Sequence, residues 1–413
     1  MLKRITVVVI LLVAVMGYAQ EGTVSPYSFY GIGSLKFRGT AENRAMAGIS
    51  VYSDSIHLNI QNPAGVAGLQ LVNYTAGLSH KYETIKTAEE SQKASTTSID
   101  YLALGIPMGK FGASFGLLPY TAVGYNLRTE ESGITTTYTG SGGVNKAFFA
   151  LAYQVTPELS IGVDANYNFG NIENTAERRE EDIQYGTEEF NKSDLLGFNF
   201  NIGAQYKTMI NERMTLFASA TYTPETNLTS ENTRTISSFL VLPSGTTTPI
   251  DERDIQVPDT EFTFPSQYTL GLGVGQDKKW FIGGEYSNIT TSNLRNRSFD
   301  IDFVTFTDAS KFRVGGFYIP NYNSIGNYWN RVVYRGGVRF EDTGITVNGE
   351  GIREFGISFG VGLPVGRLFS NVNIGFEVGR RGTTDFGLVQ ENFFNTFISL
   401  SLNDRWFKKT YYD

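Results

Sequence analysis

The sequence predicts an all-β transmembrane protein: a 14-stranded antiparallel β-barrel of the outer membrane with an N-terminal plug in its lumen. Three observations predict this fold. Segments of about ten residues alternate between apolar and polar side chains, the period of a strand with two different faces. Short turns alternate along the chain with longer polar loops. Gly, Tyr and Phe are abundant, at 45, 23 and 30 residues, and no long apolar run follows the N-terminal one.

Residues 1–19 are predicted to be a cleaved export signal. Lys3 and Arg4 form a short positive head, Ile5–Met16 is a run of 12 residues that are apolar except for Thr6, and Gly17–Ala19 resembles a cleavage site with small residues. An uncleaved membrane helix is the alternative, but this run is short against the roughly 20 residues that span a bilayer. Cleavage after Ala19 would leave Gln20 as the first residue of the exported chain.

Charge, cysteine and histidine content exclude several classes of function. The net charge of −7 becomes −9 when the signal is removed, which argues against a nucleic-acid partner. The absence of Cys excludes disulfides, thiol catalysis and a lipid-anchored cysteine. His57 and His80 are the two histidines, and Asp300 with Asp302 falls short of the six or more oxygens that Ca²⁺ takes. We therefore expect no enzyme activity, no cofactor and no metal.

The plug is predicted to comprise residues 20–67, because no strand pattern of useful length appears before Leu69. Thr40 can cap a short helix, Ala41–Ala47, which Gly48 ends. Further along, Pro63 restricts the residue before it to an extended or turn geometry. The expected plug is thus a short helix followed by an irregular hatch.

The barrel is predicted to comprise residues 68–413, including a short charged periplasmic tail, Lys408–Asp413. Ser160–Gly170 and Asn371–Gly379 show the pattern best, with one apolar and one polar or small face. A soluble sandwich would turn the apolar face inward, whereas a membrane barrel turns it toward lipid. The fourteen segments begin near Leu69, Thr97, Phe111, Val144, Ser160, Asp194, Met214, Ser266, Lys279, Lys311, Arg331, Gly351, Ser370 and Phe393.

The connections between these segments favour the barrel. Short periplasmic turns are expected at Pro107, Thr156, Met209, Gly275 and Pro364, with Pro320–Asn330 as a longer exception. Trp280, Trp329 and Trp406 fall at strand ends on that side, where an amphipathic ring anchors at the interface. Longer outer loops are expected at His80–Thr96, Asn126–Gly143, Asn171–Ser193, Asn227–Pro265, Ile289–Ser310, Gly344–Glu350 and Arg381–Asn392.

Four segments carry a resemblance to a known family: RAMAGISVYSDSIHLNIQNPAG at Arg44–Gly65 in the hatch position, RVGGFYIP at Arg313–Pro320, RVVYRGGVRFEDTGI at Arg331–Ile345 and LVQENFFNTFISLSLNDRWF near the C-terminus. With these segments the chain resembles the FadL/TodX-like outer-membrane transport proteins, in particular their Bacteroidota-type branch. The resemblance covers essentially the whole mature chain. The candidate functional residues of the hatch are Arg44, Asp54, His57, Asn62, Pro63 and Ala64, with His57 expected to pack or hydrogen-bond rather than act as a base.

The resemblance implies passive uptake of hydrophobic or amphipathic molecules, such as long-chain fatty acids, with exit sideways through the third strand. Pro119 lies in that strand and cannot donate to the ladder. Its alternative is a harmless bulge. The residues expected to border a lateral opening are Leu117, Leu118, Pro119 and Tyr120.

Apolar residues in the fourth outer loop are candidates for ligand capture: Phe239, Leu240, Val241, Leu242, Phe262 and Phe264. Their alternative role is to cover the barrel mouth by packing on each other. The third outer loop, Asn171–Ser193, is acidic and is expected to be a solvated surface.

Ionisable residues in the lumen phase are expected to pair across the lumen or hold the plug, with ligand contact as the alternative. Arg335 and Arg339 point the same way and are the best candidates to meet Asp54 or a ligand carboxylate. The full set is Lys146, Asp164, Lys207, Glu285, Arg335, Arg339, Glu341 and Glu377.

Two other functions stay open. A non-transporting barrel could be an accessory subunit of a larger outer-membrane secretion or assembly complex, with Pro320–Asn330 and the charged tail as partner surfaces. A porin-like barrel is the third option. The expected partners are therefore outer-membrane lipid, a hydrophobic small molecule, or a larger outer-membrane protein complex.

Overall fold

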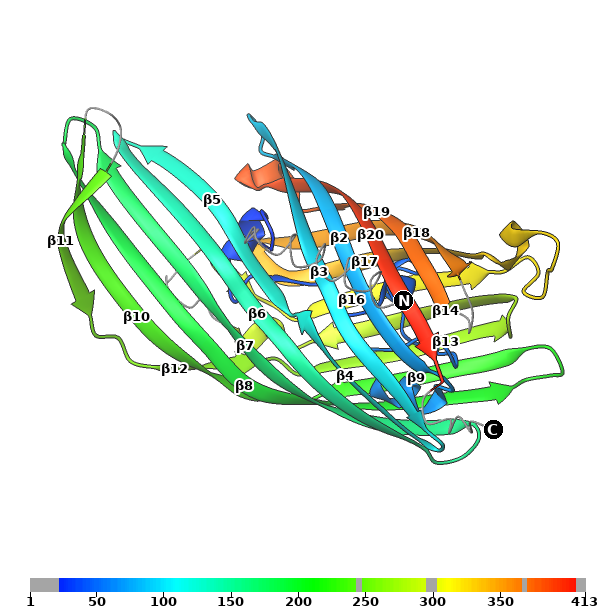
Figure 1. Ribbon diagram of the computed structural model, residues 1–413. Helices are drawn as coiled ribbons and strands as arrows, with labels where there is room; N and C mark the ends of the chain where they lie inside the picture. Colours follow the sequence, from blue (N-terminus) through cyan, green and yellow to red (C-terminus); the bar gives the residue numbers. More distant parts are fainter. Residues whose placement is uncertain (1–21, 243–246, 295–302, 366–369, 406–413) are drawn as a thin grey trace, which may run out of the picture.

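The computed structural model describes residues 22–242, 247–294, 303–365 and 370–405. The signal, Trp406, the tail and the pair Asp300 and Asp302 lie outside these ranges. In the described part, no helix is long and apolar enough to cross a membrane. The polypeptide forms a closed antiparallel barrel with the N-terminal segment inside it (Figure 1).

Fourteen positions around the barrel wall, here called staves, form the closed ladder, as the sequence predicts. Three staves are interrupted and consist of two strands each, and the last stave pairs with the first along Val72–Lys86. In order the staves are β2 (Val72–Lys86), β3 (Ser91–Met108), β4 with β5 (Phe111–Pro119, Thr121–Glu131), β6 (Ile134–Gln154), β7 (Leu159–Glu180), β8 (Tyr185–Met209), β9 with β10 (Thr215–Thr223, Thr226–Val241), β12 with β13 (Thr260–Phe264, Gln267–Gln276), β14 (Trp280–Ile289), β16 (Ala309–Tyr318), β17 (Val333–Val347), β18 (Glu350–Val365), β19 (Ser370–Arg381) and β20 (Gln390–Asp404).

The remaining elements are three strands that pair with wall strands and several short helices. Strand β1 (Ser34–Leu35) pairs with β5, β11 (Thr247–Ile255) with β10, and β15 (Val304–Phe306) with β17. The helices are short: η1 (Pro26–Phe29), α2 (Ala41–Arg44), η2 (Pro63–Gly68), η3 (Thr291–Asn293), η4 (Tyr328–Arg331) and η5 (Asp385–Gly387).

The wall is apolar outside and polar inside, which decides against a soluble sandwich. On β7, Ile161 and Val163 are 46% and 45% exposed, whereas Asp164 and Asn166, on the opposite face, are 6% and 3% exposed. The same reversal holds on β19, where Glu377 is buried between exposed apolar residues. Lipid is the solvent that suits such an exterior, so the chain is an outer-membrane barrel.

The predicted outer loops are wrong in extent, because most of them continue the strands. β6, β7 and β8 are 21, 22 and 25 residues long, and Figure 1 shows this side of the wall rising far beyond the rest. Threonine and tyrosine favour strands even where they are exposed, so polarity did not end the ladder. Ser132-Gly133 and Asn348-Gly349, each with two positive φ angles, close two hairpins tightly.

The plug helix is shorter than predicted. It ends at Arg44, because Ala47 and Gly48 take left-handed φ angles of 58° and 87°. Thr40 precedes the helix, but its hydroxyl donates to the Asn43 side chain, 2.8 Å away, rather than capping the backbone.

Candidate functional site

Two pairs of glycines on the wall make room for the plug backbone. Gly162 and Gly203 face each other in the β7–β8 register, and a Cβ on Gly203 would lie 2.2 Å from Asn62 Oδ1. Gly315 and Gly337 form the same pair between β16 and β17, where a Cβ on Gly315 would lie 2.3 Å from the carbonyl oxygen of Met46. The plug therefore sits directly on the ladder at two separate places.

The predicted Asn62-Pro63-Ala64 motif lies at the first of these places. The Asn62 side chain accepts a hydrogen bond from the Ala64 backbone N–H (3.0 Å) and donates one to the Ala204 carbonyl on β8 (3.1 Å). Pro63 begins η2, where its missing N–H is not needed. The motif thus joins the plug to the wall as well as turning the chain.

Arg44 bridges two staves, β3 and β19, which are separated around the wall by β2 and β20. Its guanidinium lies 3.2 Å from Asp100 on β3 and 3.2 Å from Glu377 on β19. Glu377 also pairs with Arg339 on β17. The network continues through Glu354, which pairs with Arg339 and with Arg381, the latter at 2.6 Å.

A second anchor lies at β14 and β16. Glu285 is 1% exposed and accepts hydrogen bonds from the Ser50 backbone N–H (2.7 Å) and hydroxyl (3.0 Å) of the plug. Arg313 pairs with Glu285 at 3.2 Å and donates to the Gly48 carbonyl at 2.7 Å. Lys311 pairs with Glu341 at 2.6 Å on the neighbouring strand. Glu285 and Arg313 thus neutralise each other and hold the plug, whereas Lys311 and Glu341 pair within the wall.

Among the residues that the structure describes, neither Arg335 nor Arg339 makes an ion pair with Asp54. Arg339 pairs with Glu354 and Glu377, and Arg335 donates to Asn373 Oδ1 at 3.0 Å. Both arginines face inward, but four residues place them about 13 Å apart along the strand, so they reach different depths of the lumen.

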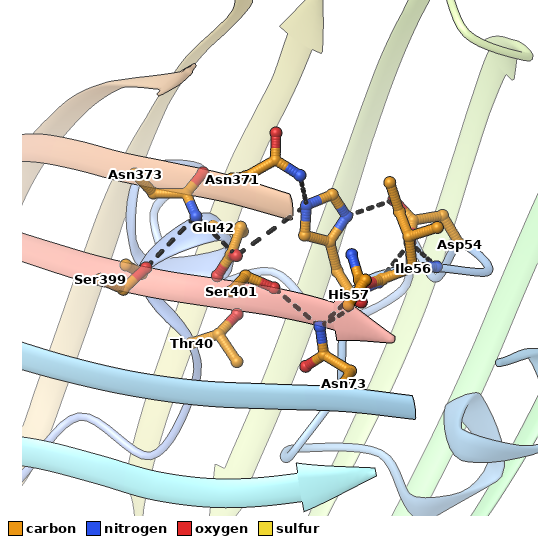
Figure 2. Close-up of polar contacts among 12 residues, drawn as sticks. Thr40, Glu42, Asp54, Ile56, His57, Asn73, Asn371, Asn373, Ser399 and Ser401 are labelled. Atoms are coloured by element: carbon orange, nitrogen blue, oxygen red, sulfur yellow. Dashed lines mark hydrogen bonds and ion pairs between the residues drawn. The ribbon is translucent and has the colours of Figure 1, made fainter. Parts of the chain in front are cut away.

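Asp54 contacts His57 instead, at the seam where the barrel closes (Figure 2). His57 Nδ1 lies 2.7 Å from Asp54 Oδ2, and His57 Nε2 lies 3.2 Å from Asn371 Nδ2 on β19 and 4.0 Å from Glu42 Oε1. Burial opposes the charge of His57, but Asp54 prevails and raises its pKa. Burial likewise opposes the charge of Asp54, but His57 and two backbone N–H groups hold its pKa below the ordinary value.

These shifts predict a pH-dependent plug. The raised pKa of His57 gives a stabilisation that is complete below the ordinary histidine value and is lost as pH rises through the raised one. The lowered pKa of Asp54 gives a second stabilisation of the folded state, which is lost only as pH falls below the ordinary aspartate range. Melting temperatures from about pH 6 to about pH 9 should therefore fall more steeply for the wild type than for His57→Asn. Parallel curves would contradict this role.

The third stave breaks at the residues singled out in the sequence. Pro119 ends β4, and the β3–β4 ladder ends at the pair Leu102 and Leu117. Beyond Tyr120, β5 keeps β6 as one neighbour but takes β1 of the N-terminal segment as the other, and Figure 1 shows β3 and β5 running apart. Leu117 is exposed, whereas Leu118 and Tyr120 are buried.

The apolar capture candidates do not form one exposed patch. Phe239 is buried beside Gly186, and Phe262 and Phe264 are buried in an apolar cluster with Tyr120 and Val144. Leu240, Val241 and Leu242 are partly exposed. The cluster packs the wall against the N-terminal segment instead of presenting a surface to the medium.

Two cavities flank the plug. The outer one, about 220 Å³, lies between the plug and strands all around the wall, from β2 to β20, and is lined mainly by charged and polar side chains, including Arg44, Lys146 and Asp164. The other, about 950 Å³, opens among the short turns and is lined by plug residues such as Asp54 and His57, with Lys207 at its edge.

Some of the residues that hold the plug were not predicted. Glu354 and Arg381 lie on inward phases of strands whose period was visible, so alternation could have identified them. Lys36 and Arg38 lie in an irregular segment without period, and nothing in the sequence marks them as lumen residues.

His80 contacts Thr97 on the neighbouring strand, with 2.7 Å between Nδ1 and Oγ1.

Comparison with known proteins gives one family and a set of similar folds. The BamG family model matches residues 1–413. No curated protein matches the chain. Among solved structures, the P. putida toluene transporter TodX is 16% identical with a TM-score of 0.62, covering 89% of this chain and 99% of that one. The Ralstonia pickettii toluene transporter TbuX has 15% identity and a TM-score of 0.61, with the same coverage. A Pseudomonas aeruginosa FadL homologue has 12% identity and a TM-score of 0.58, covering 90% of this chain and 98% of that one. The fold is therefore of the FadL/TodX type.

Proposed function

The chain belongs to the BamG family, and from this premise we propose that it is a plugged, non-conducting outer-membrane barrel that serves as a subunit of a larger outer-membrane protein complex. The name of the family agrees with an association of this kind. One observation carries the proposal: buried charges and glycine seats fasten the plug to staves on several sides of the lumen.

Moving such a plug is energetically costly. Arg44 would leave Asp100 and Glu377, and Glu285 would lose its bonds to Ser50. Removing one partner from a buried ion pair destabilises a protein by roughly 3–5 kcal/mol, and displacement of the plug would break several such contacts at once. The outer cavity is also small and charged, which does not suit an elongated apolar ligand.

The β16–β17 connection offers a surface for a protein partner. It includes η4, and Ile325 is 100% exposed with Trp329 63% and Tyr328 38% exposed. Exposed apolar side chains clustered in this way commonly mark interaction sites, and they lie on the side of the short turns. The predicted role of Trp329 as a lipid anchor is the alternative use of the same ring.

Copurification from native membranes tests this function. We expect a stoichiometric large partner with the wild type and its loss from the double variant Ile325→Asp, Trp329→Ala, because the apolar contact is removed. Ile183→Asp is the matched control, since Ile183 is also exposed but lies in a tight outer turn. Absence of any partner, together with a copurifying lipid, would contradict the proposal.

Passage of hydrophobic small molecules is the second candidate, favoured by the break at Tyr120 and by the shared fold with toluene transporters. In this alternative, a ligand enters from outside, the plug shifts, and the ligand leaves sideways past Leu117–Tyr120. The pairing of β1 with β5 then has to open, because β1 occupies the edge that the broken stave exposes.

A further inference from the structure

The outer cavity contains cations that lack carboxylate partners. Nine Lys and Arg side chains line it. Six make ion pairs: Arg44, Lys81, Lys311, Arg313, Arg339 and Arg381. Within the described ranges, Lys36, Arg38 and Lys146 make none, and Asp164 is the one lining carboxylate without an ion pair. Positive charge is thus in excess in this part of the lumen.

Arg38 and Lys146 border the same aromatic ring. Arg38 Cζ lies 5.3 Å from the centroid of the Tyr120 ring, and Lys146 Nζ lies 5.0 Å from it and 5.8 Å from that of Phe264. Lys146 is 7% exposed and, in the part of the chain that the structure describes, has no hydrogen-bond acceptor. A buried ammonium without a protein acceptor is unfavourable unless water or an anion in the cavity accepts its hydrogen bonds.

Asp164 does not fill this need. Its Oδ2 accepts a hydrogen bond from Asn201 at 3.0 Å, and its Oδ1 accepts one from Asn166. One Arg38 nitrogen donates to Gln267 on β13 at 2.6 Å, which fixes the guanidinium across the lumen. The other N–H donors of the guanidinium stay available to a ligand. The geometry presents a fork of N–H donors and an ammonium to one small polar space.

We propose that Arg38 and Lys146 form a binding site for a phosphate-type oxyanion beside Tyr120. A guanidinium binds such oxygens bidentately, and a lysine adds a compact positive charge. The space suits a small charged group, and Tyr120 lies where the third stave breaks, so the phosphate can be free or can belong to an outer-leaflet lipid whose chains stay outside. The site does not depend on whether the barrel is a subunit or a channel.

Two arms test the site on the purified full-length barrel. Calorimetric titration with inorganic phosphate measures the free ion, and native mass spectrometry after nanodisc reconstitution compares phosphatidic acid with phosphatidylcholine. Lys146→Met and Arg38→Gln should each weaken binding by roughly tenfold or more, because each removes a charge-assisted contact. Lys207→Met should bind as the wild type does, since Lys207 also stacks on a ring, that of Phe217, but lines the other cavity.

Binding in the first arm identifies free phosphate as a ligand, and binding in the second arm alone identifies a lipid headgroup; both support the site. No binding in either arm, or unchanged binding by both variants, would overturn it. Should Lys146→Met fail to fold, Arg38→Gln carries the test, because Arg38 lies in the plug segment and not in the ladder.

Discussion

Replacing Arg44 by methionine is expected to loosen the plug and to produce ion conductance in a barrel that otherwise conducts almost none. The variant removes the cation that joins β3 to β19 and leaves Asp100 and Glu377 without it. The expected loss is about 3 kcal/mol, at the low end for a broken buried pair, because Glu377 keeps Arg339. Melting temperature reports the loss, and planar-bilayer recording reports the openings.

Arg353→Met is the control for this prediction. Arg353 pairs with Asp342 at 3.8 Å, but its side chain is 83% exposed, so its removal should change stability by less than about 1 kcal/mol. Equal effects of the two variants, or large steady conductance in the wild type, would mean that the plug does not close the lumen in the way described. The second outcome would favour a porin-like barrel.

Gly203→Val should displace the Asn62-Pro63 segment from the wall. Even the first atom of the new side chain would lie 2.2 Å from Asn62 Oδ1 and 2.9 Å from Pro63 Cδ, so the plug has to move. Overpacking of this kind costs about 1–3 kcal/mol or more. A cysteine introduced at Ala64, which is fully buried in the wild type, should then react with a maleimide in the valine variant.

Gly351→Val provides the matched substitution, because Gly351 also lies in a strand but a Cβ there meets no atom within 4 Å. Ala64→Cys in the Gly351→Val background should stay as unreactive toward the maleimide as Ala64→Cys alone. If both valine variants label equally, the effect belongs to the strand and not to the seat of the plug.

The alternation of the sequence was sufficient to predict the barrel, since residues such as Ile161 and Asp164 reveal their opposite faces without any tertiary information. Strand lengths were not predictable in the same way. Outside the membrane a strand no longer needs an apolar face, so β6 to β8 continue through segments that look like loops. The Asn348-Gly349 turn was the available signal, because this dipeptide favours a tight hairpin.

The plug shows the limit of sequence patterns more clearly. Arg44 could be identified as a functional residue, but its partners Asp100 and Glu377 come from distant strands and depend on the depth at which the plug sits. The pairing of β1 with β5 was also beyond reach, because two residues in an irregular segment have no period. Pro119 was the exception, since a missing N–H weakens a ladder wherever it lies.

The geometry of the plug favours a subunit role over the uptake of hydrophobic molecules. Resemblance to transport proteins favoured uptake through the third stave. The contacts favour a fixed plug, because ion pairs of the lumen tie it to the wall and the outer cavity is small and charged. The break at Tyr120 is present, but β1 occupies its edge.

A disulfide between β1 and β5 tests the central claim most directly. Leu35 and Thr121 are directly paired, close enough for a disulfide once both are replaced by cysteine. The natural sequence contains no cysteine that could compete. The measurement is the composition of the tagged Leu35→Cys, Thr121→Cys barrel purified from oxidised native membranes. A subunit with a fixed plug should retain a stoichiometric protein partner when β1 is locked. Finding no partner in any state, and a bound apolar lipid that disappears on oxidation and returns on reduction, would contradict the account.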